Sequence, residues 1–557
     1  MSETRRGLPL RISRAERIFP TLTPAQMSRI APHGHMRLMQ RGEVIYEQGD
    51  TNVPFFVVVT GEVEIVSPSR AAETLVTVYG AGQFSGEVSY LSGRRALFRM
   101  RVTKSGELIE LDRQQMLALV QNDAELGEIL MRALVLRKVE LVAAGVGDVV
   151  LIGSMHSPST LRLKEFLMRN GHPYSYIDLD RDHDVEKLLD GYHTAASEIP
   201  IVICRGELVL RNPTNQQVAD CLGFNEAIDQ TQIRDLVIIG AGPSGLAAAV
   251  YGASEGLDVL VLETSSPGGQ AGASSRIENY LGFPTGVSGQ ELAARAYYQA
   301  QKFGAQVLIA KCKRLACDHK PYILEVENGA RIPARAIVIA TGAEYRRPPL
   351  ENLSRFEGAG VYYAATFMEA QLCSGQEVIV VGGGNSAGQA AVFLAEMTKR
   401  VHMLIRSAGL AESMSRYLIR RIEQTPKIVL HPNTEIEGLE GGDHLESVRW
   451  RNKQTGQIEE HNIRHIFVMT GADPNTHWLD GCLALDDKRF IKTGPELSPE
   501  ELSAAHWPLA RTPYLLETSL PGVFAVGDVR GGSIKRVASA VGEGSIAISF
   551  VHQVLQE

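Results

Sequence analysis

The chain has little of what marks membrane, secreted or dithiol proteins. Its 557 residues include 6 cysteines and 3 tryptophans, and no two cysteines form a C-x-x-C pair. No run approaches the ~18 consecutive apolar residues of a membrane helix. The first segment is MSETRRGLPLRISRAERIFP. A signal peptide has an apolar stretch after its basic residues, and this segment has none. We therefore expect reduced thiols, no leader, no membrane contact and a cytoplasmic protein.

An excess of basic charge is also missing. The chain has 56 Lys and Arg against 64 Asp and Glu, a net charge of −8, which disfavours nucleic acid as the main partner. With 44% hydrophobic and 22% charged residues, the composition is that of an ordinary globular protein, and no metal site is assigned. The length predicts three or four domains at ~150 residues each.

The pattern of strands and helices changes along the chain. Residues 1–143 hold β-like runs such as FFVVVTGEVEIV and then a helical stretch, which predicts a β-roll with helices. Residues 147–224 indicate a strand, a helix and three more strands in a small α/β domain. From residue 234 to the C-terminus strands and helices alternate, as an α/β fold requires.

The strongest local signal is a G-x-G-x-x-G turn at Gly240, Gly242 and Gly245. It follows an apolar strand and opens a helix, and Glu263 ends the next strand. The glycines allow a tight turn and close approach, the helix N-terminus faces a pyrophosphate, and the carboxylate can accept ribose hydroxyls. The pattern predicts dinucleotide binding; the alternative is a glycine turn needed only for packing.

A second turn, GGGNSA at 382–387, has the same setting. The next strand ends in Ile405 and Arg406 rather than in a carboxylate. Because arginine can pair with a 2′-phosphate, the pattern predicts NADPH rather than NADH, unless Arg406 is a solvated surface charge. Arg416 or Arg420 could also reach that phosphate. The predicted NADPH residues are Gly382, Gly384, Asn385, Ser386, Ala387 and Arg406.

Three further segments carry a family resemblance. They are PGGQAGASSRIENYLGF at 267–283, VIATGA at 338–343 and GVFAVGDVRGGSIKRVASAVGEG at 522–544. Together with the two turns they make 234–557 resemble the low-molecular-weight thioredoxin reductase family. The resemblance implies a homodimer and two Rossmann-like three-layer α/β domains. The FAD domain would comprise 234–349 and 475–557, with an NADPH domain inserted at 350–474.

The same resemblance implies which residues hold FAD. Gly527 would let the backbone approach, Asp528 can accept a hydrogen bond from a ribitol hydroxyl, and 536–538 would lie against the flavin ring. The implied set is Gly240, Gly242, Pro243, Ser244, Gly245, Glu263, Gly269, Gln270, Asn279, Thr341, Gly342, Gly527, Asp528, Arg536, Val537 and Ala538.

The chain departs from this family at its redox-active C-x-x-C. That position reads Ala364-Ala365-Thr366-Phe367, and neither alanine nor phenylalanine can relay electrons to a disulfide. Cys373 lies six residues past Phe367 and is more typical of a small buried apolar residue. No catalytic residue is assigned, with Cys373 as the weak candidate.

The two N-terminal domains resemble known modules as well. Residues 147–224 resemble the thioredoxin/glutaredoxin fold, with Ile199-Pro200 at its cis-proline position, but the loop that would carry C-x-x-C reads Ser157-Pro158-Ser159-Thr160. This domain is either a docking surface for a redox partner, a pseudo-substrate packed on the reductase, or a spacer.

GQFSGEVSYLSGRRALFRMRV at 82–102 resembles the phosphate-binding cassette of the cyclic-nucleotide-binding family. The N–H groups around Gly86 and Glu87 could cradle a cyclic phosphate, and Arg95 or its neighbour Arg94 could neutralise it. The arginine comes earlier after the glutamate than in the family's well-known binders. Binding of cAMP or cGMP and a ligand-free interaction module both stay open.

The resulting hypothesis is an FAD-dependent NADPH oxidoreductase, possessing a sensory domain, in which hydride passes from NADPH to FAD. Electrons would then reach an acceptor that needs no enzyme dithiol: a quinone, a ferredoxin or flavodoxin, O₂, or a disulfide presented by a partner. Two alternatives remain. One is a thioredoxin-disulfide reductase that uses an external thiol or Cys373, and the other is a flavin-bound redox sensor without turnover.

Overall fold

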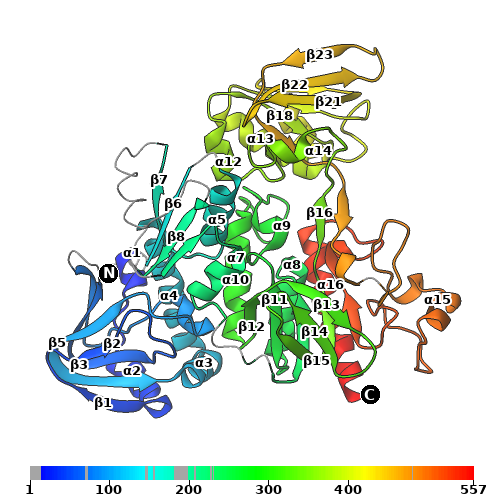
Figure 1. Cartoon of the computed structure of the whole chain (residues 1–557). Coiled ribbons are helices and arrows are strands. Elements are labelled where there is room, and N and C mark those ends of the chain that lie inside the picture. The colour runs from blue at the N-terminus through cyan, green and yellow to red at the C-terminus, as the bar shows by residue number, and fades with distance from the viewer. Residues whose placement is uncertain are drawn as a thin grey trace, which may run out of the picture.

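The computed structural model describes residues 14–68, 73–144, 148–154, 157–180, 198–205, 208–225, 229, 231–479 and 481–557. Figure 1 shows four units in chain order: a β-rich N-terminal unit, a small middle unit, and a first α/β unit into which a second α/β unit is inserted. Within the described residues, every helix is too short or too polar to cross a membrane.

The N-terminal unit is an antiparallel sheet covered by helices. Its strands follow the order β1-β5-β3-β4, with β2 beside β5. Phe55 and Phe84 meet Leu130 and Leu134 in its core, so the last helix seals the roll. The elements are α1 (Arg14–Ile18), α2 (Pro24–Ile30), β1 (His35–Met39), β2 (Val44–Tyr46), β3 (Phe55–Ser67), β4 (Thr74–Gly80), β5 (Arg99–Leu111), α3 (Arg113–Asn122) and α4 (Ala124–Ala144).

The middle unit is a four-stranded sheet in the order β7-β6-β8-β9, in which only β6 and β7 run parallel. The Ile199–Pro200 peptide bond before β8 is cis, as the resemblance implies. Helix α5 buries Leu163, Phe166 and Leu167 against this sheet. The elements are β6 (Val149–Gly153), α5 (Pro158–Arg169), β7 (Ser175–Asp178), β8 (Ile201–Cys204), β9 (Leu208–Arg211) and α7 (Asn215–Cys221).

The cysteines correct one expectation from the sequence. Reduced thiols were expected throughout, but Cys204 is bonded to Cys221 and Cys317 to Cys482. The pairs are 17 and 165 residues apart in sequence. Packing of α7 beside β8 joins the first pair, and the long return of the chain to β13 joins the second. No local spacing could reveal either bond.

The first α/β unit has a seven-stranded sheet in the order β12-β11-β10-β15-β14-β13, with β26 beside β15. Helices α8, α10 and α16 bury Leu246, Tyr297 and Ile548 in one cluster with strand residues. The elements are β10 (Arg234–Ile239), α8 (Pro243–Ser254), β11 (Val259–Glu263), α9 (Gly269–Gly272), α10 (Gly289–Lys302), β12 (Gln306–Ile309), β13 (Cys312–Ala316), β14 (Tyr322–Val326), β15 (Arg331–Ile339), α15 (Pro499–Ala504), β26 (Val523–Ala525) and α16 (Val537–Gln556).

The second α/β unit has a parallel sheet in the order β17-β24-β18-β19-β20 and a separate antiparallel sheet of β21, β22 and β23. The chain enters it through β16 and leaves through β25, which pair with each other. The elements are β16 (Ala343–Tyr345), α11 (Leu353–Phe356), β17 (Val361–Tyr362), α12 (Phe367–Leu372), β18 (Glu377–Val381), α13 (Asn385–Met397), β19 (Arg400–Leu404), α14 (Arg416–Glu423), β20 (Ile428–His431), β21 (Thr434–Gly441), β22 (Leu445–Asn452), β23 (Ile458–His461), β24 (Ile466–Val468) and β25 (Ala472–Pro474).

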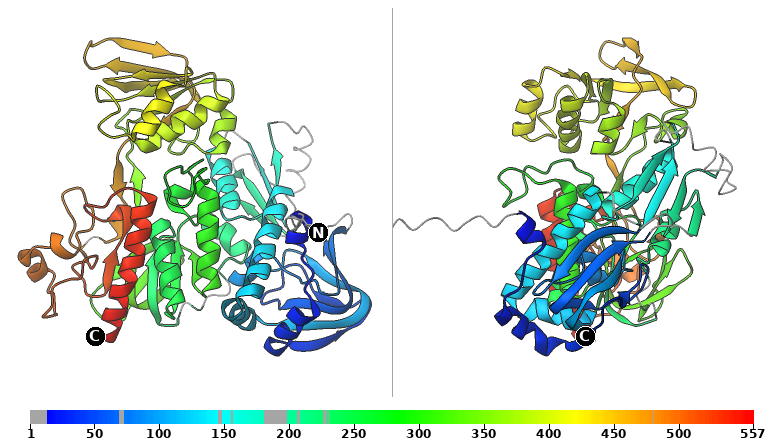
Figure 2. Two further views of the ribbon diagram at one scale, coloured as in Figure 1. Left: turned by 180° about the vertical axis from the view of Figure 1, so that it is seen from behind. Right: turned by 90° about the vertical axis from the view of Figure 1, so that its left-hand side faces the viewer.

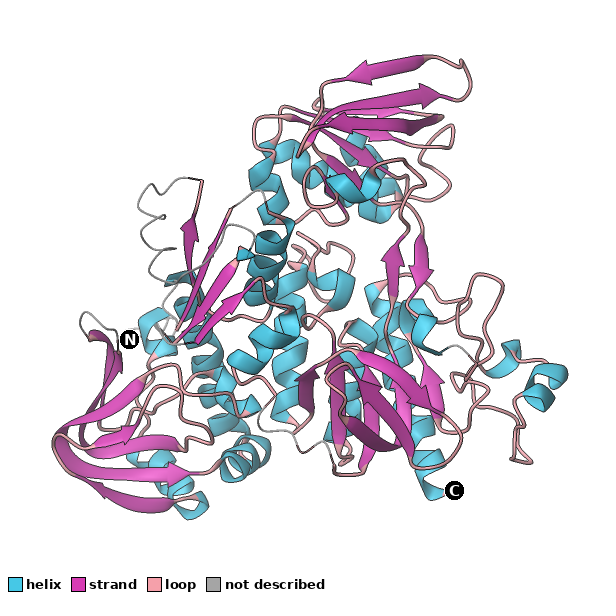
Figure 3. Cartoon of the chain, in the orientation of Figure 1, coloured by secondary structure: helices cyan, strands magenta, loops and turns pink. Residues whose placement is uncertain are grey.

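The middle unit lies between the N-terminal unit and the second α/β unit. Figure 3 shows its sheet on the outer side, with α5 turned toward the interior of the molecule. Helix α5 lies close beneath α12 in the view of Figure 1 and again when the molecule is seen from behind in Figure 2. The middle unit is therefore in a position to contact both α/β units.

Candidate functional site

The first glycine turn connects β10 to α8. Gly240 has a φ of +102°, and its N–H donates to the carbonyl oxygen of Leu262 at 2.7 Å. A Cβ on Gly245 would overlap the carbonyl oxygen of Gly240. These two glycines are required by the chain itself, because they set the turn and bring the helix close to the strand.

Gly242 has a different role in this turn. It is the N-cap of α8, followed by Pro243 at the first helical position. The nearest atom to a Cβ on Gly242 would be the Cα of Gly269, 4.0 Å away. Internal packing therefore does not demand glycine here. The space at the helix N-terminus fits the pyrophosphate of a dinucleotide, which a side chain would displace.

Glu263 ends β11 beneath this turn and is 8% exposed. Its Oε2 accepts from the N–H of Ala241 at 2.8 Å, and its Oε1 accepts from the N–H of Ser265 at 2.9 Å. A carboxylate oxygen can accept more than one hydrogen bond. Glu263 thus braces the turn and keeps acceptor capacity for a ribose hydroxyl.

Helix α9 lies against the same turn. The N–H of Gly268 donates to Ala241 O at 2.7 Å, and a Cβ on Gly269 would lie 3.0 Å from the Cα of Gly242. Gln270 donates through Nε2 to the carbonyl oxygen of Ala343. The structure therefore brings Gly269 to the turn and ties Gln270 to β16, while their contact with FAD stays a prediction.

Thr341 and Gly342 form the link out of β15. The Thr341 hydroxyl donates to Asn475 O at 3.0 Å, and the side-chain amide of Asn475 donates back to Thr341 O at 3.0 Å. The N–H of Asn475 donates to Gly342 O at 3.1 Å. Asn475 ties the outgoing link to the returning one. Sequence reasoning missed it because the residues are far apart along the chain.

Gly527 and Asp528 reach the turn from the C-terminal part. Gly527 has a φ of +74°, and a Cβ there would lie 2.6 Å from the hydroxyl oxygen of Ser244. Its N–H donates to Oε2 of Glu543 at 2.6 Å, and Arg530 donates to Oε1 at 2.7 Å. Glu543 is a second residue that the sequence did not single out, although it stands inside the quoted 522–544 segment.

Asp528 sits in a partly desolvated place beside this glutamate. Burial raises the pKa of its carboxyl group, Lys535 acts to lower that pKa, and the charge of Glu543 raises it. The carboxyl group of Asp528 has already lost part of its hydration. It can therefore exchange hydrogen bonds with the hydroxyl groups of a ligand at little further cost in desolvation. The position suits the ribitol contact that the resemblance implies.

Four predicted FAD residues are less enclosed. Asn279, Arg536 and Ala538 are exposed and Val537 is half-buried. Arg536 is the N-cap of α16 without a side-chain capping bond. No described contact joins these residues to the glycine turn, and their assignment stays a prediction.

The second glycine turn, between β18 and α13, repeats the geometry of the first. Gly382 has a φ of +140°, and its N–H donates to Leu404 O at 3.0 Å. Gly384 is the N-cap of α13, and a Cβ there would have no neighbour within 4 Å. Ala387 is fully buried. The second turn, like the first, leaves open space at the N-terminus of a helix that a side chain would fill. We call these two spaces, at Gly242 and at Gly384, the FAD cradle and the NADPH cradle after the ligands predicted for them.

Residues on both sides fasten this cradle. The Asn385 side chain accepts from the N–H of Ser415 at 2.8 Å, and Ser413 donates to Gly383 O at 2.9 Å, so the loop before α14 is held at the turn. Tyr345 lies near Ser386; burial raises the pKa of its hydroxyl, Ser386 acts to lower that pKa, and the charge of Asp528 raises it. Tyr345, missed by sequence reasoning, therefore stands between the two turns.

Arg406 follows β19 at the edge of this cradle and is exposed. Ile405, before it, is 1% exposed and lies near Gly383. The Arg406 guanidinium makes no ion pair within the described part of the chain. Arg416 and Arg420 on α14 are exposed as well. The edge of the cradle is thus cationic, which favours an added phosphate.

The position of the missing dithiol is filled by a regular helix start. Thr366 caps α12, and its partner in the capping box is Glu369. Cys373 is fully buried in the core of the second α/β unit, where its thiol donates to Ala370 O at 3.5 Å. Burial raises the pKa of Cys373 to about 12. Such a thiol is protonated at physiological pH, which makes it a poor nucleophile.

The cassette of the N-terminal unit is occupied by neighbouring side chains. Glu87 pairs with Lys138 at 3.6 Å, and Lys138 is 3% exposed. The carbonyl oxygen of Gly86 accepts from Arg137 at 2.9 Å. A Cβ on Gly223 of the middle unit would lie 2.9 Å from Arg95. The predicted ligand residues thus lie at a junction with the middle unit.

Arg94, the neighbour considered with Arg95, takes part in the same junction. Its guanidinium lies 3.7 Å from the centre of the Phe224 ring. It donates to Tyr297 of α10 at 3.2 Å and to Asn170 O at 3.4 Å. Arg94 therefore binds three groups outside its own unit.

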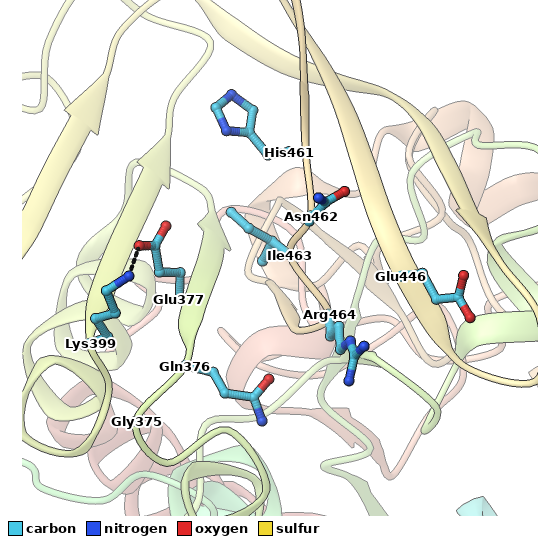
Figure 4. Close-up of a pocket in the computed structure, with 9 residues that line it drawn as sticks. All are labelled: Gly375, Gln376, Glu377, Lys399, Glu446, His461, Asn462, Ile463 and Arg464. Atoms are coloured by element: carbon cyan, nitrogen blue, oxygen red, sulfur yellow. Dashed lines mark ion pairs between the residues drawn. The ribbon is translucent and has the colours of Figure 1, made fainter.

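The cavity drawn in Figure 4 lies elsewhere. It has a volume of about 750 Å³ and opens at the amino ends of β18 and β19, where Lys399 pairs with Glu377 at 2.9 Å. Dinucleotides bind at the carboxyl ends of parallel strands, so this cavity is not the NADPH cradle. No group of three His, Cys, Asp or Glu side chains in the described ranges could hold a metal ion.

Comparisons with known proteins agree with this geometry. A family model described as pyridine nucleotide-disulphide oxidoreductase matches residues 234–544, and one for the cyclic nucleotide-binding domain matches residues 36–123. The thioredoxin reductase of Peptoclostridium litorale is 30% identical over 331 residues, which is 58% of this chain and 98% of the relative. That of Bacillus subtilis is 29% identical, over 59% of this chain and 97% of the relative.

Solved structures give the same answer. The thioredoxin reductase of Lactococcus lactis superimposes with a TM-score of 0.52 at 27% identity, covering 58% of this chain and all of that protein. The matched family segment holds both glycine turns and more than half of the chain. The chain belongs to the pyridine nucleotide-disulphide oxidoreductase family and is a thioredoxin reductase-like, FAD-dependent NAD(P)H oxidoreductase.

Proposed function

We propose that the chain oxidises NADPH through FAD and passes the electrons to an acceptor without an enzyme dithiol. The acceptor would be a quinone, a ferredoxin or flavodoxin, O₂, or a disulfide presented by a partner. The observation that carries this proposal is the contrast between two open cradles, at Gly242 and Gly384, and a dithiol position filled by Ala364 and Phe367.

The residues present fit the two groups. The N-terminus of α8, with Gly242 and Gly269, would hold the FAD pyrophosphate, and Glu263 and Asp528 would accept its hydroxyls. When bound, FAD and NADPH supply the hydride chemistry, while the protein supplies orientation. The N-terminus of α13 would hold the second pyrophosphate and Arg406 the 2′-phosphate.

The state of the two free thiols supports the proposed route for the electrons. Cys373 is buried and its pKa is raised to about 12, and Cys312 is buried as well. A disulfide substrate attacked by an enzyme thiolate therefore has no nucleophile near α12. This supports the proposal that electrons leave the flavin directly for the acceptor.

The test is anaerobic stopped-flow mixing of the flavin-loaded protein with NADPH, followed by reoxidation with a quinone, a ferredoxin, O₂ or oxidised thioredoxin. We expect bleaching of the flavin band by NADPH, and fast reoxidation by at least one acceptor other than thioredoxin. Absence of bleaching sinks the oxidoreductase proposal and favours a flavin-bound sensor. Fast reoxidation by thioredoxin alone favours the disulfide reductase alternative.

A second proposal concerns the N-terminal unit. The match of residues 36–123 to the cyclic nucleotide-binding domain supports binding of cAMP or cGMP at Gly86, Glu87 and Arg95. Because the cassette arginines contact the middle unit, a bound phosphate would have to draw one of them away. Equilibrium dialysis of the full chain against each nucleotide tests this proposal, and no binding at millimolar nucleotide contradicts it.

The remaining expectations are proposals as well. We infer domains at 1–143, 147–224, 234–349 with 475–557, and 350–474, and a cytoplasmic homodimer, on the strength of the resemblance to thioredoxin reductases. Light scattering after gel filtration measures the oligomeric state. A monomeric mass at micromolar concentration contradicts the dimer.

A further inference from the structure

The first residue of helix α5, in the middle unit, contacts the second α/β unit. A Cβ on Gly358 would lie 2.7 Å from the Cβ of Pro158, the first residue of α5, so the proline packs directly on that glycine. Further along, Glu165 lies near Glu369 of α12. The pKa of Glu369 is raised by burial first and by the charge of Glu165 in addition. Figures 1 and 2 show the two helices adjacent.

The same helix ends on the first α/β unit, beside the FAD cradle. Arg169 donates through Nη2 to the carbonyl oxygen of Gly269 at 2.6 Å, and Asn170 donates through Nδ2 to Ser265 O at 2.9 Å. Gly269 is the residue that lies against Gly242. The C-terminal end of α5 therefore holds the segment that closes the cradle.

The N-terminal unit contacts the same end of α5 through Arg94. Arg94 donates to Asn170 O at 3.4 Å and covers the ring of Phe224. One rigid helix thus contacts the other three units of the chain.

The contact at the beginning of α5 lies close in sequence to both positions that would carry dithiols, because Pro158 belongs to the first and Gly358 comes six residues before Ala364. The loop Ser157–Thr160 opens α5, and Ala364–Phe367 opens α12. Neither has a thiol, so no electrons can cross between them. A dithiol protein that approached the second α/β unit at Gly358 would first have to displace Pro158 and with it the beginning of α5.

We propose that the middle unit is a permanent internal partner, docked across both α/β units, whose residues 157–169 hold the second α/β unit with its glycine turn facing the FAD cradle. The chain crosses between the two α/β units only at β16 and β25, and a two-segment crossing by itself is a hinge. Tyr345 packs on the core of the second α/β unit, and the charge of Asp528 in the first unit adds to the rise in its pKa, so the two units lie within electrostatic reach of each other in this position. Because the chain has no dithiol at 364–367 to present to a partner, its function does not require the second α/β unit to rotate away from this position.

The docking contact is tested with two matched glycines. Gly358→Ala places a methyl group against Pro158. Gly375→Ala is the control, because Gly375 has a similar φ of +71° and no atom within 4 Å of its Cβ position. Hydrogen exchange of the full chain should rise about fivefold in segments 157–169 and 356–372 for Gly358→Ala only. Equal exchange in 157–169 for the two variants overturns the proposal.

The other end of the helix is tested with two arginines. Arg169→Ala removes the bond to Gly269, whereas Arg162→Ala removes bonds to Asn215 and Pro213 within the middle unit. Exchange in 265–273 should rise for Arg169→Ala and stay unchanged for Arg162→Ala. An equal rise in both variants overturns this contact.

The activity readout rests on the proposed function. For Gly358→Ala and Arg169→Ala we expect flavin reduction at saturating NADPH to fall about tenfold, since small misplacement of reacting groups is costly. Wild-type rates in both variants, with increased exchange, overturn the bracing role. If the wild-type flavin is not reduced at all, the proposed function fails, while the exchange comparison still decides whether α5 is docked.

Discussion

The turn between β10 and α8 and the turn between β18 and α13 use glycine differently. In the first, Gly245 stands where a Cβ would overlap the carbonyl oxygen of Gly240. In the second, the corresponding residue is Ala387, whose Cβ is accommodated 3.2 Å from the Cβ position of Gly382. Helix α8 therefore approaches its strand more closely than α13 does. Gly242 and Gly384 meet no such packing demand. A glycine motif therefore combines two requirements, one for packing and one for ligand approach.

The two turns also differ at the end of the next strand. Glu263 is buried and braces the first turn through Ala241 and Ser265. The second has buried Ile405 and exposed Arg406 in that place. A carboxylate suits ribose hydroxyls and an arginine suits a phosphate. The same fold thus presents opposite charge to two related ligands.

The largest effect is expected from Gly245→Ala. The added methyl group has no space, so we expect a loss of about 3 kcal/mol in the free energy of unfolding and loss of bound FAD. Urea unfolding and the flavin-to-protein absorbance ratio measure both. In the second turn Ala387→Gly should cost only ~1 kcal/mol. Similar stability of the two variants would remove the packing difference between the turns.

Gly242→Ala and Gly384→Ala should separate folding from ligand binding. Neither Cβ meets the protein within about 4 Å, so the free energy of unfolding should change by less than ~1 kcal/mol. Gly242→Ala should lose FAD, and Gly384→Ala should weaken NADPH binding about tenfold while keeping FAD. Isothermal titration with NADPH and the flavin absorbance report these losses. Full binding in both variants would mean that the cradles are not pyrophosphate sites.

Arg406→Ala tests the charge difference. Loss of a charge-assisted contact of ~1.5–3 kcal/mol should lower kcat/KM for NADPH about 10- to 100-fold and leave NADH unchanged. Arg400→Ala, an exposed arginine at the other end of β19, is the control. Steady-state assays with both nucleotides give the ratio. If the ratio of kcat/KM for NADPH to that for NADH did not change, the 2′-phosphate would instead be bound by Arg416 or Arg420.

The smallest effect is expected from Cys373→Ser. Because burial raises the pKa of Cys373 to about 12, the thiol stays protonated at neutral pH and only becomes an anion in strongly alkaline solution. Iodoacetamide should label it slowly in the native protein and quickly after unfolding. The variant should reduce its flavin at the wild-type rate, with a stability loss of ~1 kcal/mol. Loss of NADPH-dependent disulfide reduction would instead favour the disulfide reductase alternative.

Local patterns predicted the glycine turns well because strand, turn and helix are continuous in sequence. Gly240 and Gly382 stand in the strand–turn–helix settings that the patterns predicted. Glu543 and Tyr345 were missed because their contacts reach beyond the spacing of a local motif, even for Glu543, which lies 16 residues from Gly527. The cassette arginines were predicted as ligand groups, and the structure shows that Arg94 contacts other units.

The sequence by itself determined the two dinucleotide turns, the lack of C-x-x-C at both expected positions and the cationic end of β19, since each depends on residue types at short spacing. Only the tertiary structure decided that Cys204 pairs with Cys221 and Cys317 with Cys482, that Pro158 packs on Gly358 of the second α/β unit, and that Arg169 at the other end of α5 binds Gly269 of the first. The physical reason is that these contacts join segments separated by tens to hundreds of residues, and no local preference of the chain encodes which surfaces will meet.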